Sequence, residues 1–262
     1  MYLHTLRSVL IFSIFAIISC SSAGSDTAEP AGTTSEMPPS EALAKASVLY
    51  NKRDDLANAK KAIEILGKGR DSNNRNYDVE WKFARYSYFL GSRRTLSDEE
   101  AAPILKNGLE AARIALRMKP GLPDGHFWYA AILGEQSRRS PVTVGVPSIG
   151  KVRASLNKVI EIDKNYEGAS VYDALGQIEL ESRGLAGGSA EKAVEFFKKG
   201  IELNPDNSYL HLHLGEAYLA LNKDSDAKAH LRKVLSIKPA PDFIPEYKES
   251  EERARKLLEE KF

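Results

Sequence analysis

The chain has 262 residues, of which 42% are hydrophobic and 28% are charged, as in an ordinary soluble folded protein. Its formal charge of +1 at pH 7 shows no basic or acidic excess, so composition gives no support for a nucleic-acid partner. Because Cys20 is the single cysteine, an internal disulfide and a cysteine-based zinc site are both excluded.

Residues 1–19 have the features of a signal peptide. Arg7 precedes a short apolar run at 8–18, which has the length of a signal-peptide core and is too short for a comfortable membrane span. The run leads into Ile-Ile-Ser-Cys at 17–20, which resembles a bacterial lipoprotein signal. The resemblance implies cleavage before Cys20 and lipidation of that residue, which would anchor the chain to a membrane. The alternative is an ordinary secretory signal or a membrane anchor with an incidental cysteine.

Residues 20–39 form a segment of a different composition, rich in Ser, Ala, Gly, Thr, Glu and Pro. The segment has no apolar periodicity and cannot bury enough surface to order itself. We predict that it is a flexible linker between the lipidated Cys20 and a folded domain.

Helical pairs with apolar stripes follow the linker. The first pair carries Leu43 and Tyr50 on one helix and Ala59, Ile63 and Leu66 on the next. The spacing of these residues is helical, and no segment alternates with the period of two that marks a half-buried strand.

The second and third pairs continue the pattern. Trp81 and Tyr88 stand seven residues apart on one helix, and the helix that follows covers about 99–118. The third pair begins near Gly125, and its second helix covers about 152–162.

Two connections are longer than a helical pair needs. Residues 138–151 are rich in Pro and Gly and include Arg138 and Arg139, so they form either a partner-docking loop or simply an extended one. In the fourth pair, a Gly-rich insert at 182–188 precedes a helix. We interpret this insert as a flexible turn, with anion binding at the helix N-terminus as the alternative.

The fifth pair, at 208–241, is the clearest. It carries a Leu-Gly step at 214–215, then Tyr218, Ala227, Leu231 and Pro239, and Gly215 and Ala227 are small where the two helices approach closely. In this spacing the segment resembles a tetratricopeptide (TPR) repeat. Such a repeat cannot bury its apolar faces alone, so one repeat implies neighbours.

The resemblance implies an all-α, TPR-like superhelix of about five helical pairs plus a C-terminal capping helix. The domains are then a lipoprotein signal peptide at 1–19, the linker at 20–39, the TPR array at 40–241 and the capping helix at 242–262. Within the capping helix, Ala254 and Leu258 would cover the open end of the array. The pair Glu249/Arg253 has the four-residue spacing of a helical ion pair on a solvated face.

The sequence contains no motif that points to catalysis. It lacks the phosphate-binding, nucleophile-elbow and zinc-protease patterns, so we predict no enzyme activity, no cofactor and no metal site. His211 and His213 are two residues apart on a helix and therefore point to different sides. We interpret the histidines as structural or surface residues.

In TPR arrays the first helix of each pair faces a concave groove, which is where a ligand would bind. Transfer of that register gives a mixed aromatic and polar set that suits stacking and hydrogen bonding. The candidate binding residues are Lys82, Tyr86, His126, Tyr129, Gln136, Asp173, Gln177, Tyr209 and Glu216.

The arrangement also looks like the TPR lipoproteins associated with tripartite ATP-independent periplasmic (TRAP) transporters. The similar features are the lipoprotein signal, the aromatic helix at 126–129 with its long connection, and the Gly-rich insert before 191–193. This resemblance implies a periplasmic accessory protein that binds a small ligand and a solute-binding protein.

Our principal functional prediction is a lipid-anchored scaffold or adaptor at the bacterial cell envelope, on the outer membrane or the periplasmic face of the inner membrane. It would bind a protein partner through its concave face. The transporter accessory, with a periplasmic solute-binding protein as partner, is the alternative.

Overall fold

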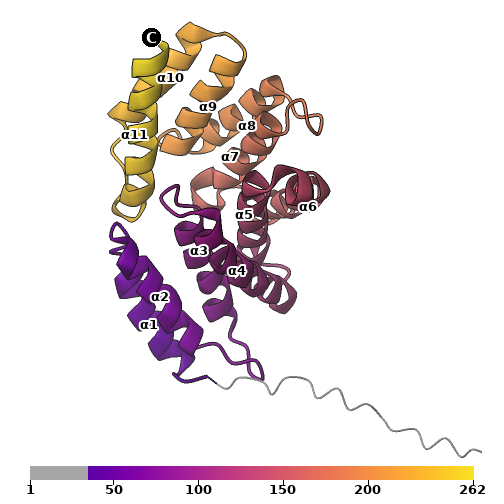
Figure 1. The fold of residues 1–262 in the computed structure, drawn as a ribbon, viewed down its shortest axis with the longest axis vertical. Coiled ribbons are helices and arrows are strands. Elements are labelled where there is room, and N and C mark those ends of the chain that lie inside the picture. The colour runs from indigo at the N-terminus through magenta and orange to yellow at the C-terminus, as the bar shows by residue number, and fades with distance from the viewer. Residues whose placement is uncertain (1–34) are drawn as a thin grey trace, which may run out of the picture. The chain divides into compact units, whose positions relative to one another are not determined.

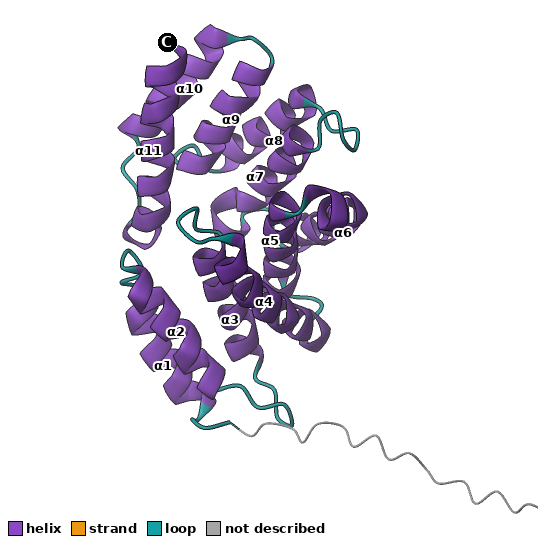
Figure 2. Cartoon of the chain, viewed as in Figure 1, coloured by secondary structure: helices purple, strands orange, loops and turns teal. Residues whose placement is uncertain are grey.

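The computed structural model describes residues 35–262, which belong to one compact unit. Within this range helices joined by loops are the regular elements, and there is no strand (Figure 2). The elements are α1 (Pro39–Tyr50), α2 (Leu56–Lys68), α3 (Tyr77–Gly91), α4 (Asp98–Met118), α5 (Pro123–Arg139), η1 (Pro141–Gly145), α6 (Val146–Ile162), α7 (Tyr166–Glu181), α8 (Ala190–Leu203), α9 (Ser208–Ala220), α10 (Asp224–Ser236), η2 (Pro241–Phe243) and α11 (Ile244–Lys261).

Polar residues fix where many of these helices begin. The side chains of Asp55, Asn76, Ser189 and Asn207 each accept a hydrogen bond from a backbone N–H in the first turn of the helix that follows. α4 begins with a full capping box, in which Ser97 and Glu100 bond each other's backbone N–H groups.

The helices are arranged in two layers along a curved array (Figure 1). Each odd-numbered helix from α1 to α11 contacts the next odd-numbered helix as well as its even-numbered neighbours. The even-numbered helices contact only the helices on either side of them in sequence. The odd-numbered helices are therefore the inner layer, and the predicted all-α, TPR-like superhelix is confirmed.

Small residues set the distance between paired helices. A Cβ atom added to Gly215 would lie 2.9 Å from Cγ of Leu231, and one added to Gly176 would lie 2.3 Å from Cε1 of Phe197. The predicted close approach at Gly215 is confirmed. Leu231 and Phe197 are fully buried at these positions, so the repeat motif marks the core of each pair.

The connection predicted at 138–151 is largely helical. α5 continues to Arg139, a single π-helical turn follows at Pro141–Gly145, and α6 begins at Val146. Pro141 and Pro147 stand in the first turns of these elements, where the N–H that proline lacks would have no partner anyway. The Pro and Gly content therefore marks the boundary between helices and not an irregular loop.

Two features of the inner layer differ from a regular array. α7 is interrupted near its start, where Glu167, Gly168 and Ala169 have φ values of 48°, 64° and 66°.

α11 caps the array with Ala254 and Leu257 buried, but its charges do not all face solvent. Glu249 and Arg253 bond residues of other helices instead of each other, which corrects the predicted pairing.

No helix among residues 35–262 is long and apolar enough to cross a membrane. The predicted signal peptide, the lipidation of Cys20 and most of the linker lie outside the described residues.

Candidate functional site

The inner layer carries ionised side chains at low exposure, and these form the candidate site. They fall into three groups, which lie around His213, around Arg85 and at the junction between the two ends of the array. Burial of charge is costly unless each group is paired, so the partners of these residues define the site.

The His213 cluster consists of Asp173, Gln177, Tyr209, His213 and Glu216. Nδ1 of His213 lies 2.7 Å from Oδ1 of Asp173, and the amide of Gln177 donates to the same carboxylate at 2.6 Å. The Tyr209 ring stacks on the imidazole, with centroids 5.7 Å apart and planes 9° apart. Glu216 accepts a hydrogen bond from Nε of Arg253 on α11 at 3.0 Å.

The pKa of His213 follows from these contacts. Burial favours the neutral ring and lowers the pKa, but the charge and hydrogen bond of Asp173, together with Glu216 and Glu181, outweigh burial and raise the pKa to about 9. His213 therefore carries a positive charge at neutral pH.

The Arg85 cluster consists of Tyr50, Tyr86, Arg85, Trp128 and Glu167. The rings of Tyr50 and Tyr86 stack with centroids 3.7 Å apart. The Arg85 guanidinium lies 5.7 Å from the centroids of both Tyr50 and Trp128 and pairs with Glu167 at 3.1 Å. Burial raises the pKa of Glu167, and the neighbouring guanidinium of Arg85 opposes that rise.

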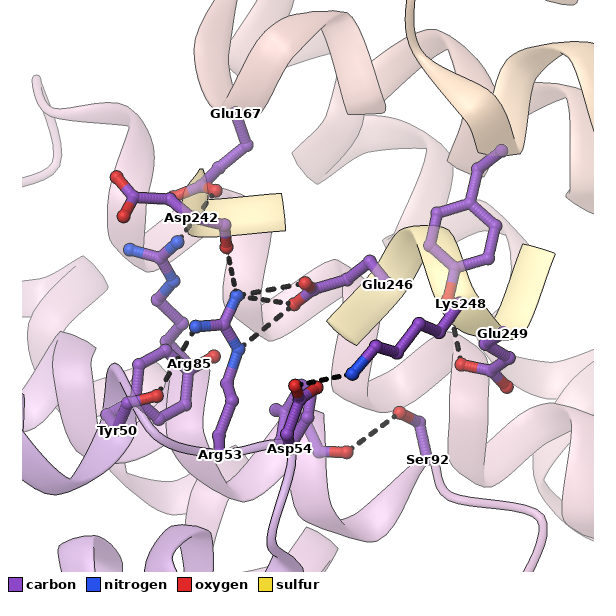
Figure 3. Close-up of polar contacts among 12 residues, drawn as sticks. Tyr50, Arg53, Asp54, Arg85, Ser92, Glu167, Asp242, Glu246, Lys248 and Glu249 are labelled. Carbon is purple, nitrogen blue, oxygen red and sulfur yellow. Dashed lines mark hydrogen bonds and ion pairs between the residues drawn. The ribbon is translucent and has the colours of Figure 1, made fainter. Parts of the chain in front are cut away.

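The third group, here called the clasp, joins the turn between α1 and α2 to η2 and α11; it consists of Arg53, Asp54, Asp242, Glu246 and Lys248 (Figure 3). Arg53 donates from Nη2 to Oε2 of Glu246 at 2.9 Å and from Nε to Oε1 at 3.2 Å, and it also donates to the carbonyl of Asp242. Lys248 reaches Asp54 at 2.7 Å. The side chain of Arg53 is only 4% exposed, so this contact is well shielded from water.

Glu249 connects the clasp region to the His213 cluster. Its carboxylate pairs with Arg93 at 2.6 Å and accepts a hydrogen bond from the Tyr209 hydroxyl at 2.8 Å. The inner side of the array is thus crossed by ion pairs that join segments distant in sequence. The loop after α3, α9 and α11 share one polar network.

Five of the nine candidate binding residues lie in these groups. Asp173, Gln177, Tyr209 and Glu216 come together in the His213 cluster, and Tyr86 is buried against Tyr50 in the Arg85 cluster.

Lys82, His126, Tyr129 and Gln136 do not join these groups. Lys82 Nζ lies 5.4 Å from the Trp81 ring, His126 bonds the carbonyl of Pro120, and Arg113 of α4 lies over Tyr129. In α5 it is Trp128, one residue before Tyr129, that donates to the Tyr166 hydroxyl of α7 at 3.1 Å. Gln136 is half-buried next to Glu135, which binds Arg138 and Arg139. A role for these four residues in binding stays a prediction.

The sequence reasoning missed His213 and the inner arginines Arg53, Arg85 and Arg93. His213 had a signal, because it stands four residues after Tyr209 and so shares its helix face. The arginines had none, since their partners lie far away in the sequence.

Two other kinds of site, a surface pocket and a metal site, find little support among the described residues. A surface hollow of about 500 Å³ is lined by Arg94, Arg138 and Arg139, but Glu135 and Asp98 already pair with the last two. Among residues 35–262 no group of three or more His, Cys, Asp or Glu residues is placed to hold a metal ion.

Comparisons with known proteins identify the relatives of this chain. Residues 42–177 match a family model described as Regulator of microtubule dynamics protein 1-3, and residues 185–248 match a tetratricopeptide repeat model. Regulator of microtubule dynamics protein 1 of mouse is 25% identical over an alignment that covers 98% of this chain and 83% of the relative. The protein of the same name from cow is 24% identical, with 83% of this chain and 70% of the relative covered.

A solved structure agrees with the fold. A thermophilic TPR protein of Thermus thermophilus superposes with a TM-score of 0.63 over 84% of this chain and 98% of that chain. The sequence identity is 17%, so this likeness concerns the fold alone.

The predicted location at the bacterial cell envelope is wrong. The curated relatives are regulators of microtubule dynamics from mouse, rat and cow and not bacterial envelope proteins. The TRAP-transporter interpretation depended on that location and on motifs that the TPR fold explains without it. A lipoprotein signal is a short pattern, and a few apolar residues before one cysteine do not establish a compartment.

Proposed function

Because the chain belongs to the Regulator of microtubule dynamics protein 1-3 family, we propose that it is a protein-binding scaffold and that its partner is the microtubule. The binding site in this proposal is the inner side of the TPR array. The proposal includes no catalytic step, since extended repeat arrays present concave surfaces for binding.

The observation that carries the proposal is the His213 cluster. Four polar residues predicted from the repeat register converge there with a charged imidazole, on two neighbouring inner helices. A purely structural core would place apolar side chains at these positions, because buried ionised groups rarely improve stability over well-packed apolar ones. Charged and aromatic groups together suit recognition of a polar protein segment.

Co-sedimentation of the full chain with microtubules assembled from purified tubulin tests the proposal. The inner variant Gln177→Ala/Glu216→Gln removes one side chain and one negative charge from the His213 cluster. The matched outer variant Asn157→Ala/Glu195→Gln makes the same change of charge at exposed residues of α6 and α8. We expect the wild type and the outer variant to pellet alike, and the inner variant to bind about tenfold more weakly, a loss of about 1.4 kcal/mol.

Circular dichroism establishes that both variants keep the helix content of the wild type. A wild-type chain that stays in the supernatant excludes the microtubule as partner. Equal pelleting of the inner and outer variants excludes the His213 cluster as the binding site.

A further inference from the structure

In three ion pairs on the inner side of the array, the arginine comes from an earlier part of the chain than its glutamate. The arginine row consists of Arg53, Arg85 and Arg93, which lie in the turn before α2, on α3 and in the loop after α3. The carboxylate row, Glu167, Glu246 and Glu249, lies on α7 and α11. The three pairs are Arg53–Glu246 at 2.9 Å, Arg85–Glu167 at 3.1 Å and Arg93–Glu249 at 2.6 Å. All the cations therefore belong to the N-terminal part, here α1 to α6, and all the anions to the C-terminal part, α7 to α11.

The arginine row is positioned by aromatic rings of its own part of the molecule. The guanidinium of Arg53 lies 4.5 Å from the Tyr50 centroid, and that of Arg93 lies 4.4 Å from the Phe89 centroid. Arg85 lies near the rings of Tyr50 and Trp128. Cation–π contacts of this kind hold a guanidinium in place without a carboxylate, so the row would keep its geometry if the glutamates moved away.

The two parts meet at the clasp without shared apolar packing. Ala46, Ala59 and Leu66 of α1 and α2 belong to a cluster that extends as far as α7. Ala254 and Leu257 of α11 pack in another cluster with residues of α9 and α10. Ion pairs close this junction. A competing carboxylate can take the place of a glutamate on an arginine, whereas apolar packing offers no such exchange of partner.

The backbone bends between the two parts, at Glu167, Gly168 and Ala169 of α7. Left-handed φ values are unfavourable for residues with a side chain, and two of these three residues are not glycine. The turn is held by Arg85 on Glu167 and by the amides of Asn204 and Asn207, which donate to the Gly168 carbonyl at 3.0 Å. One member of the carboxylate row thus stands at the bend itself.

From this arrangement we propose that the arginine row is a binding site for an acidic protein segment, and that the glutamates of α11 occupy it as an internal competitor. A partner segment rich in carboxylates would replace Glu246 and Glu249 on Arg53 and Arg93, and the clasp would open. Lys248–Asp54 has the opposite polarity, but both side chains are about half exposed and their pair contributes little. The inference rests on the proposed function, because it specifies the chemistry of the partner segment that the inner side would bind.

Binding of a fluorescently labelled hexaglutamate peptide to the full chain, followed by anisotropy, tests this inference. Glu246→Gln/Glu249→Gln removes the internal competitor and leaves every arginine in place. Glu251→Gln/Glu252→Gln makes the same change of charge on the same helix, at positions outside the carboxylate row. We expect the first variant to bind the peptide about tenfold more tightly than the second, and further substitution of Arg93→Met to abolish that gain.

Equal affinities of the two glutamine variants overturn the inference, as does a gain that survives Arg93→Met. If the double variant loses helix content, the single variants Glu246→Gln and Glu249→Gln make the same comparison with smaller gains. Peptide binding without microtubule binding retains this site and excludes the proposed partner. Microtubule binding without any peptide gain excludes the internal competitor and leaves the proposed function standing.

Discussion

His213 shows how one carboxylate decides the charge of a buried ring. Burial favours the neutral imidazole and lowers the pKa of His213, and the carboxylate of Asp173 is the largest influence that opposes it. With Asp173 at 2.7 Å, the ring holds its proton to a pH of about 9. The inner side therefore presents an ion pair between α7 and α9 where the sequence alone suggested a structural histidine.

We predict that Asp173→Asn lowers the pKa of His213 from about 9 toward its ordinary value. The folded-state pKa of the wild type lies above the unfolded value, so the pair contributes its full stability below pH 6.5. That contribution, at most about 3 kcal/mol, is lost as the pH rises through about 9. The stability gap between wild type and variant should therefore be wide at pH 6 and narrow at pH 9.5.

NMR titration of the imidazole protons and urea unfolding at the two pH values measure these effects. Asp224→Asn, at an exposed position on α10, is the control and should leave both unchanged. A stability gap that widens with rising pH would contradict the assigned charge of His213.

At the scale of a single helix, α5 contains two glycines with opposite roles. A Cβ atom on Gly125 would lie 2.5 Å from the backbone nitrogen of Leu116 in α4, whereas one on Gly134 would meet nothing within 4 Å. Gly125 therefore allows a close helix contact, and Gly134 only leaves a helix position without a side chain.

We predict that Gly125→Ala destabilises the protein by about 1–3 kcal/mol, because backbone atoms of α4 must move to admit the methyl group. Gly134→Ala should stabilise it by about 0.5–1 kcal/mol, because alanine loses less conformational entropy in a helix. Thermal and urea unfolding of the two variants should shift in opposite directions. Shifts of the same sign would show that the α4–α5 contact is not as close as described.

The helices also differ in how well the sequence predicts their bounds and their packing. The fifth pair was predictable because Leu214, Gly215 and Tyr218 are local determinants of how two adjacent helices pack. The start of α6 was not, because Pro147 in a first helical turn is indistinguishable from proline in a loop. In α5 the transferred register selected Tyr129, whereas Trp128, one residue earlier, bonds Tyr166 of α7. On a helix one residue is a rotation of about 100°.

At the scale of the whole molecule, the clasp could not be predicted from the sequence. Arg53 and Glu246 are 193 positions apart, and neither belongs to the repeat motif. The curvature that brings them together is the sum of small rotations between successive pairs, and no single residue encodes it.

We predict that Arg53→Met destabilises the protein by about 1–3 kcal/mol, because it removes several charge-assisted hydrogen bonds at a shielded position. Hydrogen exchange should accelerate in the α1–α2 turn and at the start of α11, and much less in the fifth pair. Arg255→Met, which removes an exposed pair within α11, is the matched control and should change little. Equal effects of the two variants would mean that the clasp contributes no more than a surface ion pair.

The outer helices touch only their sequence neighbours, and each inner helix reaches no further than the next inner helix, so contacts between the described helices join near neighbours in the array. Such arrays fold by growth from any point, and their terminal units normally fray one at a time. Here the first and last units hold each other, so fraying at one end removes a partner from the other. The two termini of the array should consequently lose structure together, as one cooperative event.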